Sequence, residues 1–188
     1  MWFRYGALLL CCLLTAGCSM SMQELEQQLE SSFSEQLYLD ARLEFALSHP
    51  LDWQRLQTPV SSPGYRADRV RWQIMDSQKS VCGEMQVISL AADPNRLLLE
   101  LLDSANPPQS EPLSGTIEHI DLPIGPALQR QAQFPEHNRL TTAVKGHGKD
   151  FIISFSYPAN QAEQFRPVFA KILASFNDLS CPPDQNRP

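Results

Sequence analysis

The sequence predicts an α+β fold in which helices pack on an antiparallel β-sheet within a single domain. Three observations lead to this prediction. The 188 residues, 43% of them hydrophobic and 19% charged, fit one globular core with appendages. Several short segments alternate apolar and polar residues with a period of two, which is typical of half-buried strands. Two further segments repeat apolar residues every three or four positions, which is typical of helices.

The first residues do not belong to this domain. Arg4 is followed by an apolar run over residues 7–14 and then by small residues before Cys18. A transmembrane helix needs about 20 apolar residues, so this shorter run predicts a secretory signal over residues 1–17. Leu14-Thr15-Ala16-Gly17-Cys18 resembles a bacterial lipobox, with Thr15 in the place where leucine is commonest. A plain secretory signal and an anchor helix with a chance cysteine are the alternatives.

The resemblance to a lipobox implies that Cys18 carries acyl chains and that the lipid bilayer is one partner of the protein. Each buried methylene contributes ~0.8 kcal/mol of membrane affinity, so two or three chains anchor a protein without a spanning helix. In Gram-negative lipoproteins the next residue directs sorting, and Ser19 is not the aspartate that retains them at the inner membrane. The expected location is the periplasmic face of the outer membrane.

The mature chain is acidic. The formal charge of the whole sequence is -6, and it becomes -7 when Arg4 leaves with the signal. Such a chain has no basic stripe to neutralise phosphates, so we expect no nucleic-acid partner. Broad electrostatic adhesion to anionic lipid is not expected either, and attachment would rest on the acyl chains.

Two cysteines remain for the folded part of the chain. Cys11 and Cys12 leave with the signal and Cys18 is consumed by lipid, which leaves Cys82 and Cys181. An even pair in an oxidising compartment predicts a disulfide. Closing a loop of roughly 100 residues would add ~4.7 kcal/mol of stability in the chain-entropy model. The alternative is a buried Cys82 thiol and a free thiol in the tail.

The segment over residues 18–37 is predicted to be a lipidated tether. Ser21 and Glu24 have the spacing of a capping box, and apolar residues follow at helical intervals up to Phe33. A short helix and a partly ordered spacer are both consistent with this pattern. The folded domain is predicted over residues 38–177, and a Pro-rich tail over residues 178–188.

Strands open the predicted domain. The first covers residues 43–48 and ends in a turn at Pro50, which cannot continue a central ladder. A loop over residues 58–66 leads to a second strand with alternating apolar residues at 70, 72 and 74. Residues 83–90 form the third strand.

A leucine-rich helix comes next. Asp93 is expected to cap it and Pro94 to occupy its first position. Residues 97–102 are so uniformly apolar that the helix should be buried on more than one side. The proline pair at 107–108 ends it, and residues 107–115 read as a connector.

Four more strands and a closing helix complete the domain. The strands are expected over residues 116–121, 127–134, 140–144 and 151–157, with a hairpin turn at 145–150. Asn160 and Glu163 repeat the capping pattern ahead of the last helix. Because Pro167 interrupts that helix, we expect two pieces, residues 159–165 and 167–176.

The order and spacing of these elements resemble the PsbP/DcrB-like superfamily over residues 38–177. Its members begin with a Phe-containing strand that runs into Pro-x-x-Trp, as Phe45 to Trp53 does here, and end with a helix similar to residues 165–176. The long Pro-rich connector and the cysteine pair depart from many members. The resemblance implies a PsbP-like scaffold that acts as a binding or accessory module, and it carries over no catalytic residue.

The sequence contains no recognisable catalytic or metal-binding motif. Its histidines are widely spaced and lack the His-x-x-x-His, Cys-x-x-Cys or Glu-x-x-His patterns of metal sites. His137 and His147 could converge with Glu136 or Asp150, although solvated loop histidines are the simpler interpretation. Likewise, Cys82 could act as a nucleophile with His119, but a disulfide or a buried thiol is simpler. We therefore expect no enzyme, no metal and no cofactor.

Candidate binding surfaces are loops, because binding residues concentrate in loops on a rigid scaffold. The hairpin over residues 145–150 and the loop over residues 57–66 are two such loops. Trp53 and Trp72 could line a ligand groove, but core packing explains them more simply. The sequence thus predicts a non-enzymatic lipoprotein that binds an envelope protein. The alternative is a small-ligand or lipid-binding module with a cleft between sheet and helix, and an enzyme ranks third.

Overall fold

A computed structural model of the chain describes residues 35–57, 68–76, 78–105 and 115–180. All of them belong to one compact unit, Glu35–Pro188. The predicted signal, Cys18 and the tether up to residue 34 lie outside the described residues. So do Cys181 with the tail that follows it, and most of the loop at 57–66 and of the connector at 107–115.

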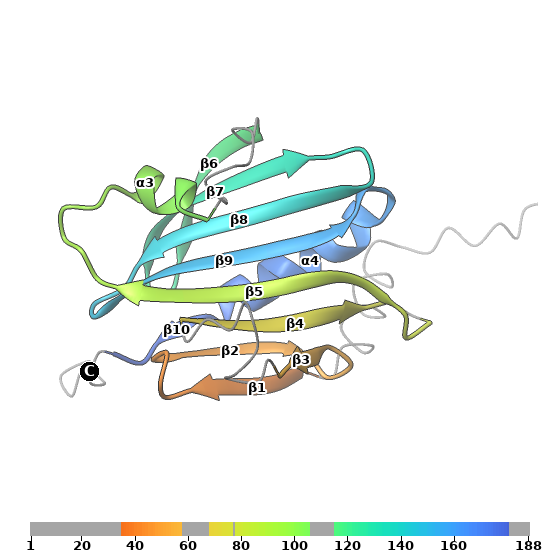
Figure 1. The fold of residues 1–188 in the computed structure, drawn as a ribbon, viewed down its shortest axis with the longest axis horizontal. Helices are drawn as coiled ribbons and strands as arrows, with labels where there is room; N and C mark the ends of the chain where they lie inside the picture. The colour runs from red at the N-terminus through yellow and green to blue at the C-terminus, as the bar shows by residue number, and fades with distance from the viewer. Residues whose placement is uncertain (1–34, 58–67, 77, 106–114, 181–188) are drawn as a thin grey trace, which may run out of the picture. The chain divides into compact units, whose positions relative to one another are not determined.

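The unit contains two antiparallel sheets (Figure 1). The smaller sheet has the order β1-β2-β10 and consists of β1 (Glu35–Asp40), β2 (Phe45–Pro50) and β10 (Asn177–Asp178). The larger sheet has the order β3-β4-β5-β9-β8-β7-β6. Its strands are β3 (Gln54–Leu56), β4 (Arg69–Met75), β5 (Val81–Ala91), β6 (Gly115–Leu122), β7 (Gly125–Gln133), β8 (His137–Lys145) and β9 (Lys149–Pro158).

Helices cover both faces of the larger sheet. The short helix α3 (Leu98–Asp103) packs on one face, against β7, β8 and β9. A 3-10 turn, η1 (Ala159–Gln161), leads into α4 (Ala162–Ala174), which lies behind the sheet in Figure 1 and contacts β9 and β2. Within the described residues no helix is long and apolar enough to cross a membrane. The predicted α+β class, an antiparallel sheet with helices packed on it, is confirmed.

Aromatic side chains form the core between α4 and the sheets. Alternate residues of β9 face α4, as its period of two predicts, and Phe155 stacks on Phe169 of the helix with ring centroids 4.0 Å apart. Phe45 of β2 stacks on Phe176 at 5.6 Å, which joins the small sheet to the end of the helix segment. Packing of this kind adds about 0.5–1.5 kcal/mol per ring pair beyond the area buried.

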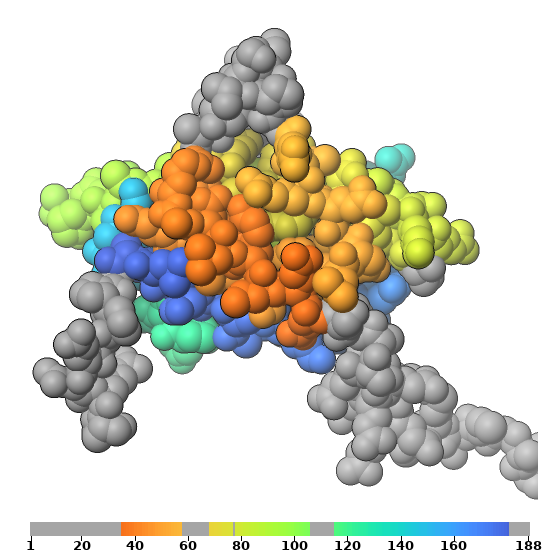
Figure 2. Space-filling model, turned by 90° about the horizontal axis from the view of Figure 1, so that it is seen from below, coloured from red at the N-terminus to blue at the C-terminus, as the bar shows by residue number. Residues whose placement is uncertain are grey.

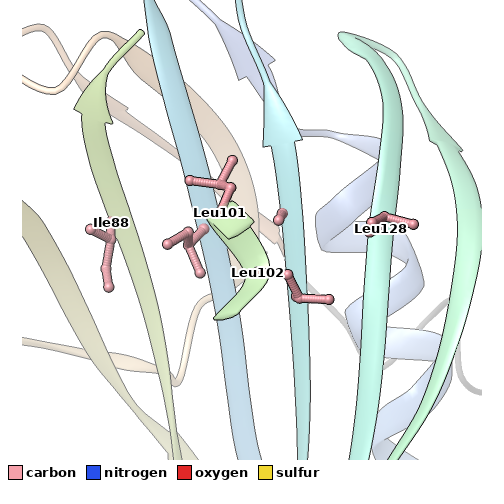
Figure 3. Close-up of a cluster of buried hydrophobic side chains, with 6 residues drawn as sticks. Ile88, Leu101, Leu102 and Leu128 are labelled. Atoms are coloured by element: carbon pink, nitrogen blue, oxygen red, sulfur yellow. The ribbon is translucent and has the colours of Figure 1, made fainter. Parts of the chain in front are cut away.

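A second hydrophobic cluster lies on the opposite face of the large sheet, under α3. Leu101 and Leu102 point from the helix toward the sheet and are fully buried, and they pack in one cluster with the buried Ile88 and Leu128 (Figure 3). The prediction that this helix is buried on more than one side is wrong, because Leu97 and Leu99 are 65% and 45% exposed. One face of a short helix is enough to cover the available part of the sheet.

The start of α3 also differs from the prediction. Asp93 accepts a hydrogen bond from the backbone N–H of Asn95 and so closes a turn instead of capping the helix. The carboxylate of Glu100 accepts the N–H of Leu97 at 3.1 Å, so the helix begins at Leu98. The side chain of Glu100, inside the first turn, therefore takes the role that was predicted for Asp93.

The closing helix is continuous through Pro167, which corrects the prediction of two pieces. Proline lacks only the hydrogen bond that would reach the carbonyl of Glu163. That carbonyl belongs to the exposed first turn, where water can satisfy it. Asn160 lies in η1 and does not cap the helix; the capping position is Gln161, which makes no side-chain cap bond.

Three short strands were not predicted. β1 occupies the end of the expected tether and pairs with β2, from Glu35 opposite Pro50 to Asp40 opposite Phe45. β3 follows the turn at Trp53 and pairs with β4. β10 returns from α4 to pair with β2 on its other side.

Candidate binding site

A cleft of about 690 Å³ lies between α4 and the part of the large sheet formed by β6, β7 and β8. This volume is within the usual range of small-molecule sites, about 300–1,000 Å³. The floor includes Gln129, Gln131 and Leu140 from the sheet, and the wall includes Arg166 and Leu173 from the helix. α4 contacts β9, whereas β6 and β7 extend beyond it (Figure 1), so this part of the sheet lacks a helical cover on the α4 side.

The strand register places the floor residues on the face that α4 covers. Leu140 is paired with both Gln131 and Phe155, and the ring of Phe155 stacks on α4. Gln131 and Leu140 therefore face the same side of the sheet as Phe155. Gln129, two residues earlier in β7, shares this face and donates a hydrogen bond from Nε2 to the hydroxyl of Thr142 at 3.0 Å.

The wall of the cleft is one edge of α4. Arg166, Ala170, Leu173 and Ala174 are spaced by three or four residues, so they lie along one side of the helix. Alanine at 170 and 174 leaves space that a larger side chain would occupy. The sequence of α4 therefore both packs its Phe-rich face on the core and keeps the cleft open.

Tyr157 lies at the inner side of the cleft. Its side chain is 1% exposed, and its hydroxyl has no hydrogen-bond partner of standard geometry. Burial raises the pKa of Tyr157, and both the charge of the nearby Arg166 and its hydrogen-bonding contact with the hydroxyl oppose that shift. The phenol is therefore a protonated hydrogen-bond donor at neutral pH.

The charges that line the cleft are unequal. Arg166 supplies one positive charge, whereas Glu118 and Asp121 of β6 supply two negative ones. The ion pair between Arg166 and Glu163 is long, at 4.0 Å, and both side chains are largely exposed. Such a pair contributes little, so the guanidinium can turn to a ligand at small cost.

Cys82 is a free, half-buried thiol on β5. Burial is the main cause that raises its pKa, and the carboxylate of Asp76 adds to the effect. The thiol also donates a hydrogen bond to the carbonyl of Ile74 at 3.4 Å. A protonated thiol in this setting is a poor nucleophile.

The bridge between Cys82 and Cys181 stays a prediction, because Cys181 lies outside the described residues, but Ser180 lies far from Cys82. Ser180, which precedes Cys181, accepts a hydrogen bond from the backbone N–H of Gly148 at the β8–β9 turn. Cys82 lies at the other end of β5, a strand whose far residue Ala91 pairs beside that turn. Nine residues of strand span roughly 30 Å, which is the approximate distance between Cys82 and the strand end near Ser180.

The other catalytic and metal-binding alternatives are not assembled. Cys82 on β5 and His119 on β6 are separated by four strand spacings, about 19 Å. His137 and His147 lie at opposite ends of β8. Among the described residues, no group of three or more His, Cys, Asp or Glu side chains could hold a metal ion.

The two tryptophans belong to the core. Trp53 and Trp72 are 5% and 0% exposed, and Trp53 packs edge-on against Phe169. The edge of the Tyr38 ring likewise meets Trp72 with the centroids 5.0 Å apart. Neither tryptophan lines the cleft.

The hairpin at 145–150 is held by contacts within the domain. Lys145 donates from Nζ to the carbonyl oxygens of Asp93 and Arg96, at 2.6 and 2.9 Å. Asp150 is fully buried and forms an ion pair with Arg96 at 3.0 Å. These contacts hold the segment before α3 against the hairpin. Less of the hairpin is therefore free for a partner than the sequence suggests.

Comparison with solved structures identifies the fold. The solution structure of cyanobacterial PsbP (CyanoP) from Synechocystis sp. PCC 6803 matches with a TM-score of 0.55 at 15% sequence identity, over 78% of this chain and 93% of that one. The described unit has a PsbP-like fold. A crystal structure from Bacteroides thetaiotaomicron VPI-5482 matches with a TM-score of 0.50 at 12% identity; it covers 76% of this chain, which spans about half (47%) of that protein. No family model and no curated protein sequence matches the chain.

The cleft of this PsbP-like domain was not predicted residue by residue. One signal was present in the sequence: β7 places Gln129 and Gln131 at alternate positions between the buried Ala127 and the end of the strand. Polar side chains on the face that packs against a helix indicate a region without dry packing. Strand order and the extent of α4 decide whether such a region is a cleft, and neither is visible in the sequence of β7 alone.

Proposed function

We propose that this protein is a lipid-anchored lipoprotein of the cell envelope whose PsbP-like domain binds a protein partner and catalyses no reaction. The observation that carries the proposal is the outer face of β1, an edge strand of the small sheet. Leu37 and Leu39 lie on this face and are 68% and 58% exposed. Apolar side chains that remain exposed on an edge strand are a common protein-binding feature.

The β1–β2 hairpin presents this face to solvent (Figure 2). Tyr38, between the two leucines, turns inward and packs against Phe45 and Trp72. Leu37 and Leu39 therefore face away from the core, and only a one-residue shift in the register of β1 would turn them inward. The unpaired backbone edge of β1 can in addition hydrogen-bond an extended segment of a partner, a recurrent mode of peptide recognition.

Anchoring would keep this face close to a bilayer. Glu35 follows Cys18 by 17 residues, which reach at most roughly 60 Å when fully extended. Lipidation of Cys18 would therefore restrict β1 to the layer next to the membrane surface. With Ser19 as the sorting residue, the proposed location is the periplasmic side of the outer membrane.

Membrane fractionation tests the anchor. The Cys18→Ala variant should be released from outer-membrane fractions, or retained at the inner membrane as an uncleaved precursor. The wild-type chain should show acyl chains on Cys18 by mass spectrometry of its first peptide. Retention of Cys18→Ala in the outer membrane at the wild-type level would contradict the anchor.

Site-specific photo-crosslinking in intact cells tests the partner. A photoreactive residue at position 37 or 39 should capture one protein in good yield. The matched control is position 163 at the start of α4, where the Glu163 side chain is 96% exposed and follows the η1 turn, which contacts β8. Equal capture from both surfaces, or none from β1, would contradict docking at this strand.

A further inference from the structure

We propose that the cleft between α4 and β6–β8 is a binding site for an amphipathic monocarboxylate, a molecule with one carboxylate and an apolar chain. This site lies on other elements than the β1 face and does not depend on a protein partner. Three observations carry the proposal: an unsatisfied donor, a single available cation and an apolar wall.

The hydroxyl of Tyr157 is the unsatisfied donor. It is buried and lines the cleft, and its one polar neighbour there is Arg166, which can only donate, so the O–H proton of Tyr157 has no acceptor among the described residues. Buried polar groups in native proteins are almost always paired, and an unpaired one indicates an absent partner. Because the phenol donates, the absent partner is an acceptor, as a carboxylate oxygen would be.

Arg166 supplies the charge that selects an anion. Its guanidinium lines the cleft together with Tyr157, and it lies close enough for its charge to act on the phenol of Tyr157. Together, the arginine guanidinium can form a planar ion pair with a carboxylate and the tyrosine hydroxyl can donate a neutral hydrogen bond to it. Glu118 and Asp121 on the β6 side would repel further negative charge, so the site disfavours polyanions such as nucleotides.

The remainder of the cleft suits an apolar chain. Leu140 forms part of the floor and Leu173 part of the wall, and the small residues Ala170 and Ala174 keep the helix side shallow. A site of this size can bury most of a medium-length chain. Burial of each methylene contributes ~0.8 kcal/mol, so a chain of about ten carbons supplies most of the affinity while Arg166 and Tyr157 fix its orientation.

Photolabelling of the full chain in its membrane tests the site. The probe is dodecanoic acid with a diazirine in the middle of its chain, and the labelled residues are mapped by mass spectrometry. Label should appear on α4 and on β6–β8. The corresponding dodecanol probe, which lacks the carboxylate, should label these peptides about tenfold less.

Three variants separate the contributions. Arg166→Gln should lower labelling of the cleft by dodecanoate about tenfold or more, and Lys171→Gln, one turn onward on the exposed side of α4, is the matched control that should not. Tyr157→Phe should also lower labelling but leave the thermal midpoint nearly unchanged, because the O–H that it removes donates to no acceptor among the described residues. Ala170→Trp, at an exposed position, should block the cleft without disturbing the core.

The outcomes are decisive in both directions. Labelling that maps to the cleft, prefers the acid over the alcohol and falls in Arg166→Gln but not in Lys171→Gln supports the proposal. Equal labelling by the two probes overturns the carboxylate assignment. Label outside α4 and β6–β8, or a Tyr157→Phe variant that is destabilised yet labels normally, overturns the site, and neither result bears on docking at β1.

Discussion

Tyr38 joins the small sheet to the core through several contacts of one side chain. Its hydroxyl donates to Asp40 at 2.9 Å, its ring meets Trp72 edge-on, and the guanidinium of Arg55 lies 5.2 Å from the ring centroid. Burial, followed by the hydrogen bond and the charge of Asp40, raises the pKa of Tyr38 to about 12. The folded state thus stabilises the neutral form of the Tyr38 phenol.

This shift predicts how stability changes at high pH. The pKa is about 12 in the folded state and about 10 in the unfolded state. The contribution of Tyr38 is therefore complete below pH 10 and is lost as the pH rises toward 12, because only the unfolded chain ionises in that window. Urea midpoints measured across this range should fall, and they should fall less in Tyr38→Phe.

The decline should not vanish in Tyr38→Phe, because Tyr157 also has a raised pKa. A variant whose midpoint declines as steeply as that of the wild type would show that Tyr38 does not carry the effect.

Cys82 gives a second prediction for a single residue. Its position at the end of β5 opposite to Ser180 predicts a free thiol in the purified, unreduced protein. Alkylation after denaturation, without reductant, should modify Cys82 almost completely, and alkylation of the folded protein near neutral pH should be slow because its pKa is raised. A peptide that links Cys82 to Cys181 would contradict the prediction of a free thiol and show that the disulfide forms.

At the scale of elements, α3 has buried leucines on one face and an exposed leucine on the other. Leu102→Ala should lower the free energy of unfolding by about 2–5 kcal/mol, because it leaves a cavity in a fully buried cluster. Leu99→Ala is the control on the same helix and should change it by less than about 0.5 kcal/mol. Chemical denaturation measures both. Similar losses in the two variants would mean that α3 does not pack as the structure has it.

Strands with a clear period of two were predicted well. β4, β5, β7 and β9 agree with the expected segments to within a few residues, because apolar residues recur at alternate positions in each. The missed strands lack that signal. β3 and β10 are only three and two residues long, and β10 forms through pairing with β2, about 130 residues earlier in the chain.

Pro167 and Asp93 show why element boundaries were harder to predict. Pro167 lies inside α4, but the carbonyl that it leaves unpaired belongs to the solvated first turn, so a local rule that breaks helices at proline fails there. Asp93 is a residue type that often caps helices, but here the carboxylate of Glu100, inside the helix, accepts the free N–H of Leu97. In both cases the position within the element decided the outcome, and residue type alone did not.

At the scale of the whole molecule, the arrangement of the sheet decides which residues can act together. The order β5-β9-β8-β7-β6 separates Cys82 from His119, and it brings Glu118 and Gln131 together with Arg166 in one cleft. Residue types alone could not reveal that Cys82 and His119 lie apart, and strand periodicity could not reveal the cleft. Both depend on contacts between segments far apart in the chain.

The central claim is that the domain docks a protein partner through the outer face of β1. The most direct test is the mass of the protein in mildly solubilised membranes, measured by size exclusion with light scattering for the wild type and for the double variant Leu37→Ser, Leu39→Ser. Both positions are exposed, so this variant should keep its thermal midpoint. We predict a complex heavier than a single chain for the wild type and a single chain for the variant. A wild type without a partner, or a variant that retains it, would contradict the claim.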